Sequence, residues 1–318
     1  MKLTSRPALR NALASFCGGL ASVTCATMVW ASAPDAAAAA IPMQRNTYGV
    51  YTVDVTVGRG LLFSGNPEAD PIPFIVDTGA NRTAVPRLIA SQLIADEQIS
   101  FDQIAHAVTG PFATGLFFIN QLDFGMGPRE VEVAIFEEDY GSVMSAAGIL
   151  GSNAFTNEVI VLDYPALELR RERGISAPAD MPLRIENGII IGEGRVRGVP
   201  GPVRVFVDTG ANASIVNTAL VRRRGPAVGR QATQIEGVSG GAVARGETRR
   251  LVSNFEVSEL CSGGFTVAVS DLYFFDGMGW AEEPSIILGM DFLQHARITI
   301  DYGNASARIE GTGHLACP

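Results

Sequence analysis

The chain has 318 residues, of which 47% are hydrophobic, so it is long enough to bury a substantial core in one or two domains. Its formal net charge of −9 argues against binding of a phosphate backbone, and no nucleic-acid partner is expected. Lys2 is the only lysine and there are only 3 histidines, which excludes lysine-based catalysis from the body and leaves mainly carboxyl groups.

The first 33 residues have the pattern of an export signal. Lys2, Arg6 and Arg10 precede an uncharged stretch at 11–33 that ends in Ala-Ser-Ala, which matches the site of signal peptidase. We therefore expect residues 1–33 to be a signal peptide and the protein to be periplasmic or secreted. The alternative is an uncleaved anchor, since about 20 apolar residues can span a bilayer. Membrane attachment is expected only in that case.

Two cysteines, Cys261 and Cys317, lie outside this segment. In an exported protein an even pair favours a disulfide, which here would hold the C-terminal tail. Spacing alone does not establish the bond.

The rest of the chain carries one series of landmarks twice. Each series has a predicted strand, an Asp-Thr-Gly-Ala-Asn turn, a short helix, a glycine-rich hairpin, a second strand, a Leu-Gly segment and a closing strand. The first series lies at 48–58, 77–81, 85–94, 107–115, 131–139, 148–155 and 158–170. The second lies at 184–198, 208–212, 217–224, 236–246, 265–275, 286–293 and 297–309.

This ordered correspondence indicates internal duplication. An Asp-Tyr dipeptide even recurs 12 residues after the Leu-Gly glycine in both series, with Asp163 and Asp301 expected at the surface or in turns. The β-branched content and the absence of long helical periodicity predict an all-β protein. We expect a first half at 42–172, a linker at 173–181 and a second half at 182–318.

The repeated turn has the residue types that an acid–base site needs. Apolar residues before Asp77 and Asp208 predict buried strands, and the glycines allow close backbone approach. If the two turns meet, their carboxyl groups share one proton, because both cannot easily ionise a few ångströms apart. One carboxyl can then take a proton from water while the other donates to a carbonyl oxygen. This chemistry requires no metal or organic cofactor.

The motifs "VDTGAN" and "ILG", with a glycine-rich hairpin between them, resemble those of the retropepsin-like aspartic proteases. In that family one subunit supplies one Asp-Thr-Gly and two subunits form the enzyme. The resemblance therefore implies two protease lobes in one chain, an intrachain pseudo-dimer with a cleft for protein or peptide substrates, and a monomer. It makes Asp77 and Asp208 the catalytic pair. The supporting residues that it implies are Thr78 and Thr209 between the lobes, Gly79 and Gly210 beside the aspartates, and flaps around Gly110 and Gly240.

The sequence departs from the viral members of this family at two pairs of positions. Those members have aspartate after Asp-Thr-Gly-Ala and arginine after the later glycine, whereas this chain has Asn81 and Asn212, then Ser152 and Met290. The substrate preference of the viral enzymes is therefore not implied. Asn81 and Asn212 are expected to line the cleft and to contribute to specificity.

Two other functions fit parts of the sequence. A protein with the same fold could bind peptides without cutting them, although both aspartates are intact. The segment 237–241 also matches Gly-x-Ser-x-Gly, so Ser239 could act with Asp271 or Asp276 and with His295 or His314. A serine hydrolase needs a strand–turn–helix at this point, whereas the flanking residues favour a hairpin.

Overall fold

The computed structural model describes residues 40–58, 71–94, 98–136, 148–172, 182–224, 228–236, 243–251 and 254–316. All of them belong to one compact unit, Ala37–Pro318. The expected signal peptide and linker lie outside the described residues, as do Ser239, Gly240 and Cys317. Within the described part of the chain, no helix is long and apolar enough to cross a membrane.

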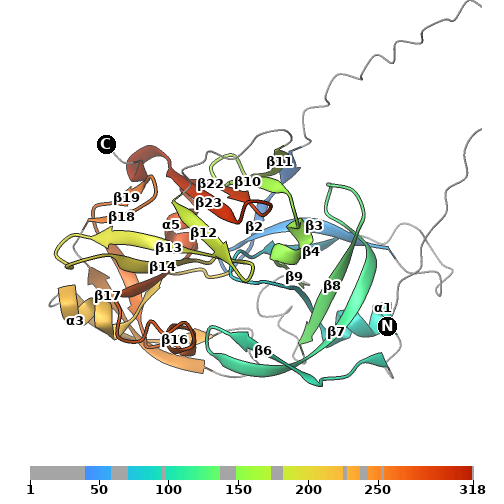
Figure 1. Cartoon of the computed structure of the whole chain (residues 1–318), viewed down its shortest axis with the longest axis horizontal. Coiled ribbons are helices and arrows are strands. Elements are labelled where there is room, and N and C mark those ends of the chain that lie inside the picture. Colours follow the sequence, from blue (N-terminus) through green and yellow to red (C-terminus); the bar gives the residue numbers. More distant parts are fainter. Residues whose placement is uncertain are drawn as a thin grey trace, which may run out of the picture. The chain divides into compact units, whose positions relative to one another are not determined.

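The described residues are mostly β structure, as the sequence predicts (Figure 1). The strands of the first half are β1 (Ile41–Pro42), β2 (Gln44–Arg45), β3 (Tyr51–Val57), β4 (Ile72–Val76), β5 (Thr83–Pro86), β6 (Gln103–Ala107), β7 (Gly110–Asp123), β8 (Arg129–Phe136), β9 (Gly148–Leu150), β10 (Val159–Asp163) and β11 (Glu168–Glu172). Those of the second half are β12 (Leu183–Glu186), β13 (Ile189–Val196), β14 (Val203–Val207), β15 (Ile215–Val216), β16 (Val228–Glu236), β17 (Val243–Leu251), β18 (Phe255–Val257), β19 (Leu260–Ser262), β20 (Phe265–Val269), β21 (Ser285–Leu288), β22 (Ala296–Asp301) and β23 (Ser306–Gly311). The helices are α1 (Arg87–Leu93), α3 (Thr218–Arg224), α4 (Tyr273–Gly277) and α5 (Met290–Leu293), with 3₁₀ turns η2 (Ser152–Phe155) and η3 (Gly313–Leu315).

The two halves build the same sheet from equivalent strands. The order β3-β4-β9-β5-β8-β7-β6 in the first half corresponds to β13-β14-β21-β15-β20-β17-β16 in the second. In both, the strand before the aspartate pairs in parallel with the strand that ends in Leu, and that strand pairs antiparallel with the next one. The fold is therefore all-β with two lobes of equivalent strand order, which confirms the duplication predicted from the sequence.

A shared sheet joins the two halves. Strand β10 pairs antiparallel with its equivalent β22, so that Val161 faces Thr299 (Figure 1). Each of these two residues lies 10 positions after the glycine of its own Leu-Gly segment. Equivalent residues that face each other place a local two-fold axis between Val161 and Thr299. Strands β1, β10 and β11 of the first half thus lie in the sheet of the second.

Several segments that the sequence analysis treats as single strands are hairpins. The segment 184–198 folds as β12 and β13 around Asn187 and Gly188, whose φ angles of 50° and 82° suit a two-residue hairpin turn. The segments 158–170 and 297–309 likewise form β10–β11 and β22–β23. The predicted strand 265–275 ends at Val269, and its aromatic residues begin helix α4.

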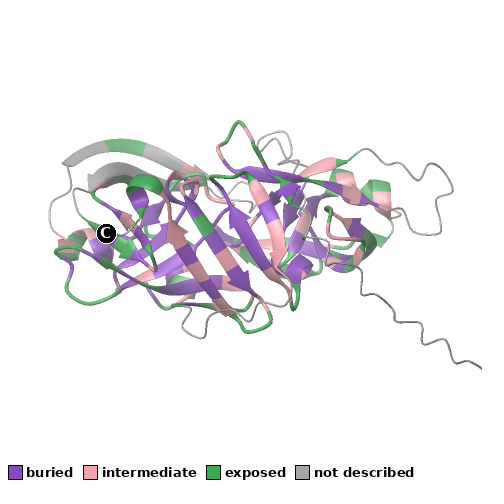
Figure 2. Ribbon diagram, turned by 90° about the horizontal axis from the view of Figure 1, so that it is seen from above, coloured by how far each residue is buried: buried purple, intermediate pink, exposed green. Residues whose placement is uncertain are grey.

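Buried residues run along the strands of both sheets, while exposed residues gather at turns (Figure 2). Asp163 and Asp301 end their strands and begin turns, but the expectation of a surface position is wrong, because they are only 3% and 2% exposed. Asp163 accepts hydrogen bonds from Arg170 and Arg297. Asp301 instead accepts from the backbone and side chain of Asn304. These local partners compensate the two buried carboxylates.

Candidate active site

The two aspartates leave the ends of equivalent buried strands. Asp77 follows β4 and donates its backbone N–H to the Leu150 carbonyl at 3.0 Å, and Asp208 follows β14 and donates to the Leu288 carbonyl at 3.0 Å. The three residues before each aspartate, 74–76 and 205–207, are apolar and buried on both faces of the sheet. The Leu-Gly segments therefore support the aspartate loops from behind.

Two buried threonines connect the aspartate loops. The N–H of Thr78 donates to Thr209 Oγ1 at 3.0 Å, and the N–H of Thr209 donates to Thr78 Oγ1 at 3.1 Å. Each hydroxyl in turn donates across the interface, Thr78 to the Val207 carbonyl at 2.8 Å and Thr209 to the Val76 carbonyl at 2.6 Å. This reciprocal set of four bonds fixes the residue before each aspartate to the other half.

Each aspartate also lies against the glycine of the opposite loop. A Cβ atom at Gly79 would lie 2.7 Å from Asp208 Cγ, and one at Gly210 would lie 2.5 Å from Asp77 Oδ2. Real Cβ atoms do not approach that closely, so only glycine leaves room for the facing carboxyl group. The structure thus brings together the six residues that the sequence analysis places at the centre of the site, namely Asp77, Thr78, Gly79, Asp208, Thr209 and Gly210.

Burial raises the pKa of both carboxyl groups above the usual carboxyl range. A hydrogen bond from the Gly79 N–H at 2.8 Å limits the rise at Asp77, and hydrogen bonds from the Gly210 and Ala211 N–H groups at 3.0 and 3.1 Å limit it at Asp208. The negative charge of one carboxyl group opposes ionisation of the other, so the pair carries one proton over the pH range between its two ionisations.

A second pair of contacts holds the loops, and the sequence analysis missed it. The Thr83 hydroxyl donates to Asn153 Oδ1 at 2.9 Å, and the Ser214 hydroxyl donates to Asp291 Oδ1 at 2.6 Å. The two hydroxyl oxygens accept the N–H of the following Leu-Gly glycine at 3.3 and 3.0 Å. The repeat itself contained the signal, because both hydroxyl residues lie six positions after their aspartate and both partners lie two positions after their glycine.

The departures from the viral members of the family have clear places in the structure. Asn81 and Asn212 are exposed, so their side chains are accessible to a ligand beside the aspartate loops. Ser152 is buried and its hydroxyl donates to the Asn81 carbonyl at 3.2 Å, while Met290 is 1% exposed in the main core. A hydrogen bond at Ser152 and apolar packing at Met290 are thus found where the viral members of the family have arginine.

The first glycine-rich hairpin contacts the opposite half. Gly110 begins β7 after the turn with a φ of 153°. His106 Nδ1 lies 3.1 Å from the Tyr273 hydroxyl, with their rings stacked at 7°, and the Phe274 N–H donates to the Val108 carbonyl at 3.2 Å. Val108 also packs on an apolar cluster that includes Phe206 in the strand before Asp208. The first hairpin therefore reaches across to the second half, while Gly240 of the second hairpin lies outside the described residues.

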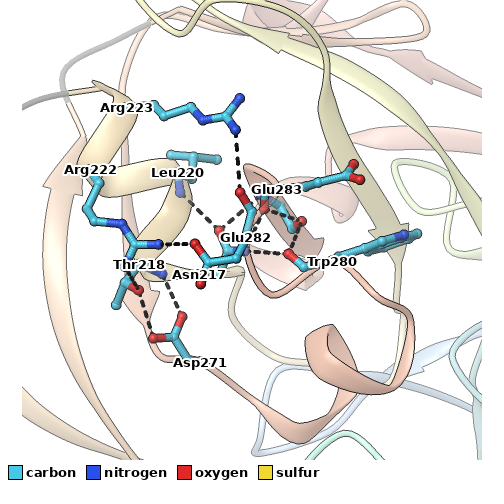
Figure 3. A network of polar contacts seen from close by, with 10 residues as sticks. Asn217, Thr218, Leu220, Arg222, Arg223, Asp271, Trp280, Glu282 and Glu283 are labelled. Carbon is cyan, nitrogen blue, oxygen red and sulfur yellow. Dashed lines mark hydrogen bonds and ion pairs between the residues drawn. The ribbon is translucent and has the colours of Figure 1, made fainter.

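The described partners of the alternative serine triad are not assembled. Asp271 accepts the Thr218 N–H at 2.8 Å and its hydroxyl at 2.7 Å, which ties it to the start of α3 (Figure 3). Asp276 lies in α4 and is exposed. The His295 ring packs against that of His314, with 5.1 Å between the centroids. Ser239 lies outside the described residues, so this reading has support only from its five-residue motif.

A family model described as aspartyl protease matches residues 53–154 and matches again at 192–292. The chain belongs to the retropepsin-like aspartyl proteases. Each match contains one Asp-Thr-Gly and one Leu-Gly segment of this protease, and together they cover more than half of it. The resemblance drawn from the motifs is thereby confirmed, including its duplication. No curated protein matches the chain.

The threonine contacts predict a large effect of one isosteric substitution. Thr209→Val leaves the buried Thr78 N–H and Val76 carbonyl without partners, so the free energy of unfolding should fall by about 2–4 kcal/mol in urea denaturation. Thr209→Ser keeps the hydroxyl and should recover most of that loss. The exposed Thr156→Val, which also removes a hydrogen bond, should cost less than about 1 kcal/mol. Equal losses for the two valine variants would contradict the role given to Thr209.

Proposed function

We propose that this protease is an aspartic endopeptidase that cleaves peptide bonds in protein substrates with Asp77 and Asp208 as its catalytic pair. The observation that carries the proposal is the crossing of the two loops, in which each carboxyl group lies against the opposite Gly79 or Gly210. Membership of the aspartyl protease family supports the same activity. Two carboxyl groups held in this way can exchange protons with one bound water and one amide.

The shared proton gives the two carboxyl groups complementary roles. The ionised member of the pair is the base that takes a proton from water as the water oxygen attacks the amide carbon. The protonated member gives its proton to the carbonyl oxygen, so a neutral tetrahedral diol forms. When the C–N bond breaks, the first carboxyl group returns its proton to the leaving nitrogen and the second takes one back from the diol. The pair ends with the one proton with which it began.

The substrate lies in an extended conformation between the halves in this proposal. The hairpin at Gly110 reaches the second half through Val108, and this contact supports its role as a flap that covers a bound peptide. Asn81 and Asn212 are exposed beside the loops and can donate to or accept from a peptide backbone or side chain. Because one chain supplies both aspartates, the active species is a monomer, without a cofactor.

Cleavage assays with substitutions at the two aspartates test the proposal. An unfolded protein incubated with the enzyme between pH 4 and 7 should be cut by the wild type, and by Asp77→Asn and Asp208→Asn at least about a thousandfold more slowly. Asp54→Asn changes an exposed carboxyl group on β3 and is the matched control, with activity unchanged. The rate should also decline toward higher pH as the pair loses its shared proton, and activity per molecule should not depend on dilution.

The outcomes of this assay separate the candidate functions. Cleavage that survives both asparagine substitutions overturns the catalytic pair, and cleavage lost only in Ser239→Ala favours the serine hydrolase. Binding of the unfolded protein by the wild type, without any cleavage, favours a peptide-binding protein of the same fold.

We also propose that the protease acts outside the cytoplasm, in the periplasm or as a secreted protein. The signal-like pattern at 1–33 supports this location, and Cys261 is disulfide-bonded, which suits an oxidising compartment. The mass of the protein recovered from the extracytoplasmic fraction should correspond to a chain that lacks residues 1–33. A full-length chain found in the cytoplasm contradicts the proposed location.

A further inference from the structure

The second half carries a small apolar core on the side of its sheet from which Asp208 projects. Strand register places four residues of this core side by side across β13, β14, β21 and β15, namely Ile191, Phe206, Ile287 and Ile215. Phe206 and Asp208 lie two positions apart, and the Asp208 N–H continues the pairing of β14 with β21. Their side chains therefore leave the strand on the same side. Any group that covers this row lies beside Asp208.

Helix α4 and the first glycine-rich hairpin cover this row together. Phe274 of α4 stacks on Phe206, with 4.3 Å between the ring centroids and 22° between the ring planes. Val108, in the turn between β6 and β7, packs on the same apolar cluster. The Phe274 N–H donates to the Val108 carbonyl at 3.2 Å. Phe274 and Val108, one from each half of the chain, are therefore in direct contact over the row.

The hairpin and α4 also meet through two exposed side chains. His106 Nδ1 lies 3.1 Å from the Tyr273 hydroxyl, and the two rings are stacked with 5.9 Å between their centroids. Tyr273 is 39% exposed, and His106 is exposed as well. Water can replace such a contact at little cost, so the contact can break without unfolding either half.

Helix α4 is fixed to its own half, whereas the hairpin is less firmly held. Before α4, Asp271 accepts the N–H and the hydroxyl of Thr218 at 2.8 and 2.7 Å (Figure 3). After α4, the buried Asn217 side chain donates to the carbonyls of Trp280 and Glu283 at 3.1 and 2.7 Å (Figure 3). In the hairpin, by contrast, no residue of β6 is buried. The hairpin is therefore the part that can move away from α4 at low cost.

We propose that Tyr273 and Phe274 form a dock that holds the first hairpin over the active site when no substrate is bound. This inference rests on the proposed function, in which the hairpin is a flap. Val108 and Phe274 cover the apolar row beside Asp208, so a peptide enters only after the hairpin has left the dock. The apparent dissociation constant of a peptide is then the intrinsic constant divided by the undocked fraction of the enzyme.

The backbone amide of Phe274 reports docking directly, because its hydrogen-bond acceptor is on the hairpin. Tyr273→Phe removes the hydroxyl that contacts His106, so it should speed exchange of this amide with solvent roughly two- to tenfold, the effect of one hydrogen bond. His106→Ala breaks the same contact from the hairpin side and should have a similar effect, and the double variant should add little to it. The measurement is amide exchange by NMR on the protein without substrate.

Tyr48→Phe is the matched control. Tyr48 is 40% exposed, close to the 39% of Tyr273, and lies in the turn between β2 and β3. This substitution should leave exchange at Phe274 unchanged. Exchange at Phe274 that is equal in Tyr273→Phe and the wild type overturns the dock.

A binding measurement tests whether the dock controls entry. A fluorescently labelled unfolded protein is titrated with each variant in the Asp77→Asn background, where cleavage does not interfere. Tyr273→Phe should tighten binding by about the factor by which it speeds exchange at Phe274. Faster exchange with unchanged or weaker binding overturns the control of entry. If no variant binds the labelled protein and the wild type cleaves nothing, the proposed function fails, while the exchange at Phe274 still establishes or overturns the dock.

Discussion

Everything in this site depends on holding two carboxyl groups together in a buried place. Isolated carboxylates avoid such positions, because burial removes their hydration and each repels the other. Contacts between uncharged groups hold the two loops together against that repulsion. Thr78 and Thr209 exchange four hydrogen bonds with the opposite backbone, and Gly79 and Gly210 remove the atoms that would keep the carboxyl groups apart. Sharing one proton then removes most of the remaining repulsion.

The sheet that joins the halves explains why these contacts are in register. The pairing of β10 with β22 places equivalent residues around one axis, and the same axis relates the two aspartate loops. Fusion of both halves into one chain also allows the side chains to differ. Asn153 supports one loop and Asp291 the other, and burial raises the pKa of Asp291. Two identical subunits could not encode such an asymmetry.

The meeting of the two Asp-Thr-Gly loops could be predicted from the sequence, because local motifs specify each loop. The apolar residues before Asp77 and Asp208 form the strands, and the glycine in each turn allows the close approach that the fold requires. Features that depend on distant partners were not predictable in the same way. Asp163 is buried because Arg297, far along the chain, lies beside it, and His106 meets Tyr273 only after both halves have folded. The aromatic stretch after Val269 has the composition of a strand but forms α4 as it packs beside Phe206.

The most direct test of the central claim is the pH dependence of stability. The folded protein raises the pKa of both carboxyls above the ordinary value of 3.8, so it retains protons that the unfolded chain releases. This contribution to stability is present at low pH and is lost as the pH rises through the raised values. The free energy of unfolding is measured in urea from pH 4 to 7 for the wild type and for Asp208→Asn. The account predicts that the wild type loses stability relative to the variant as the pH rises. A difference in the free energy of unfolding between the two proteins that stays constant, or that shifts in favour of the wild type, contradicts a buried pair that shares a proton.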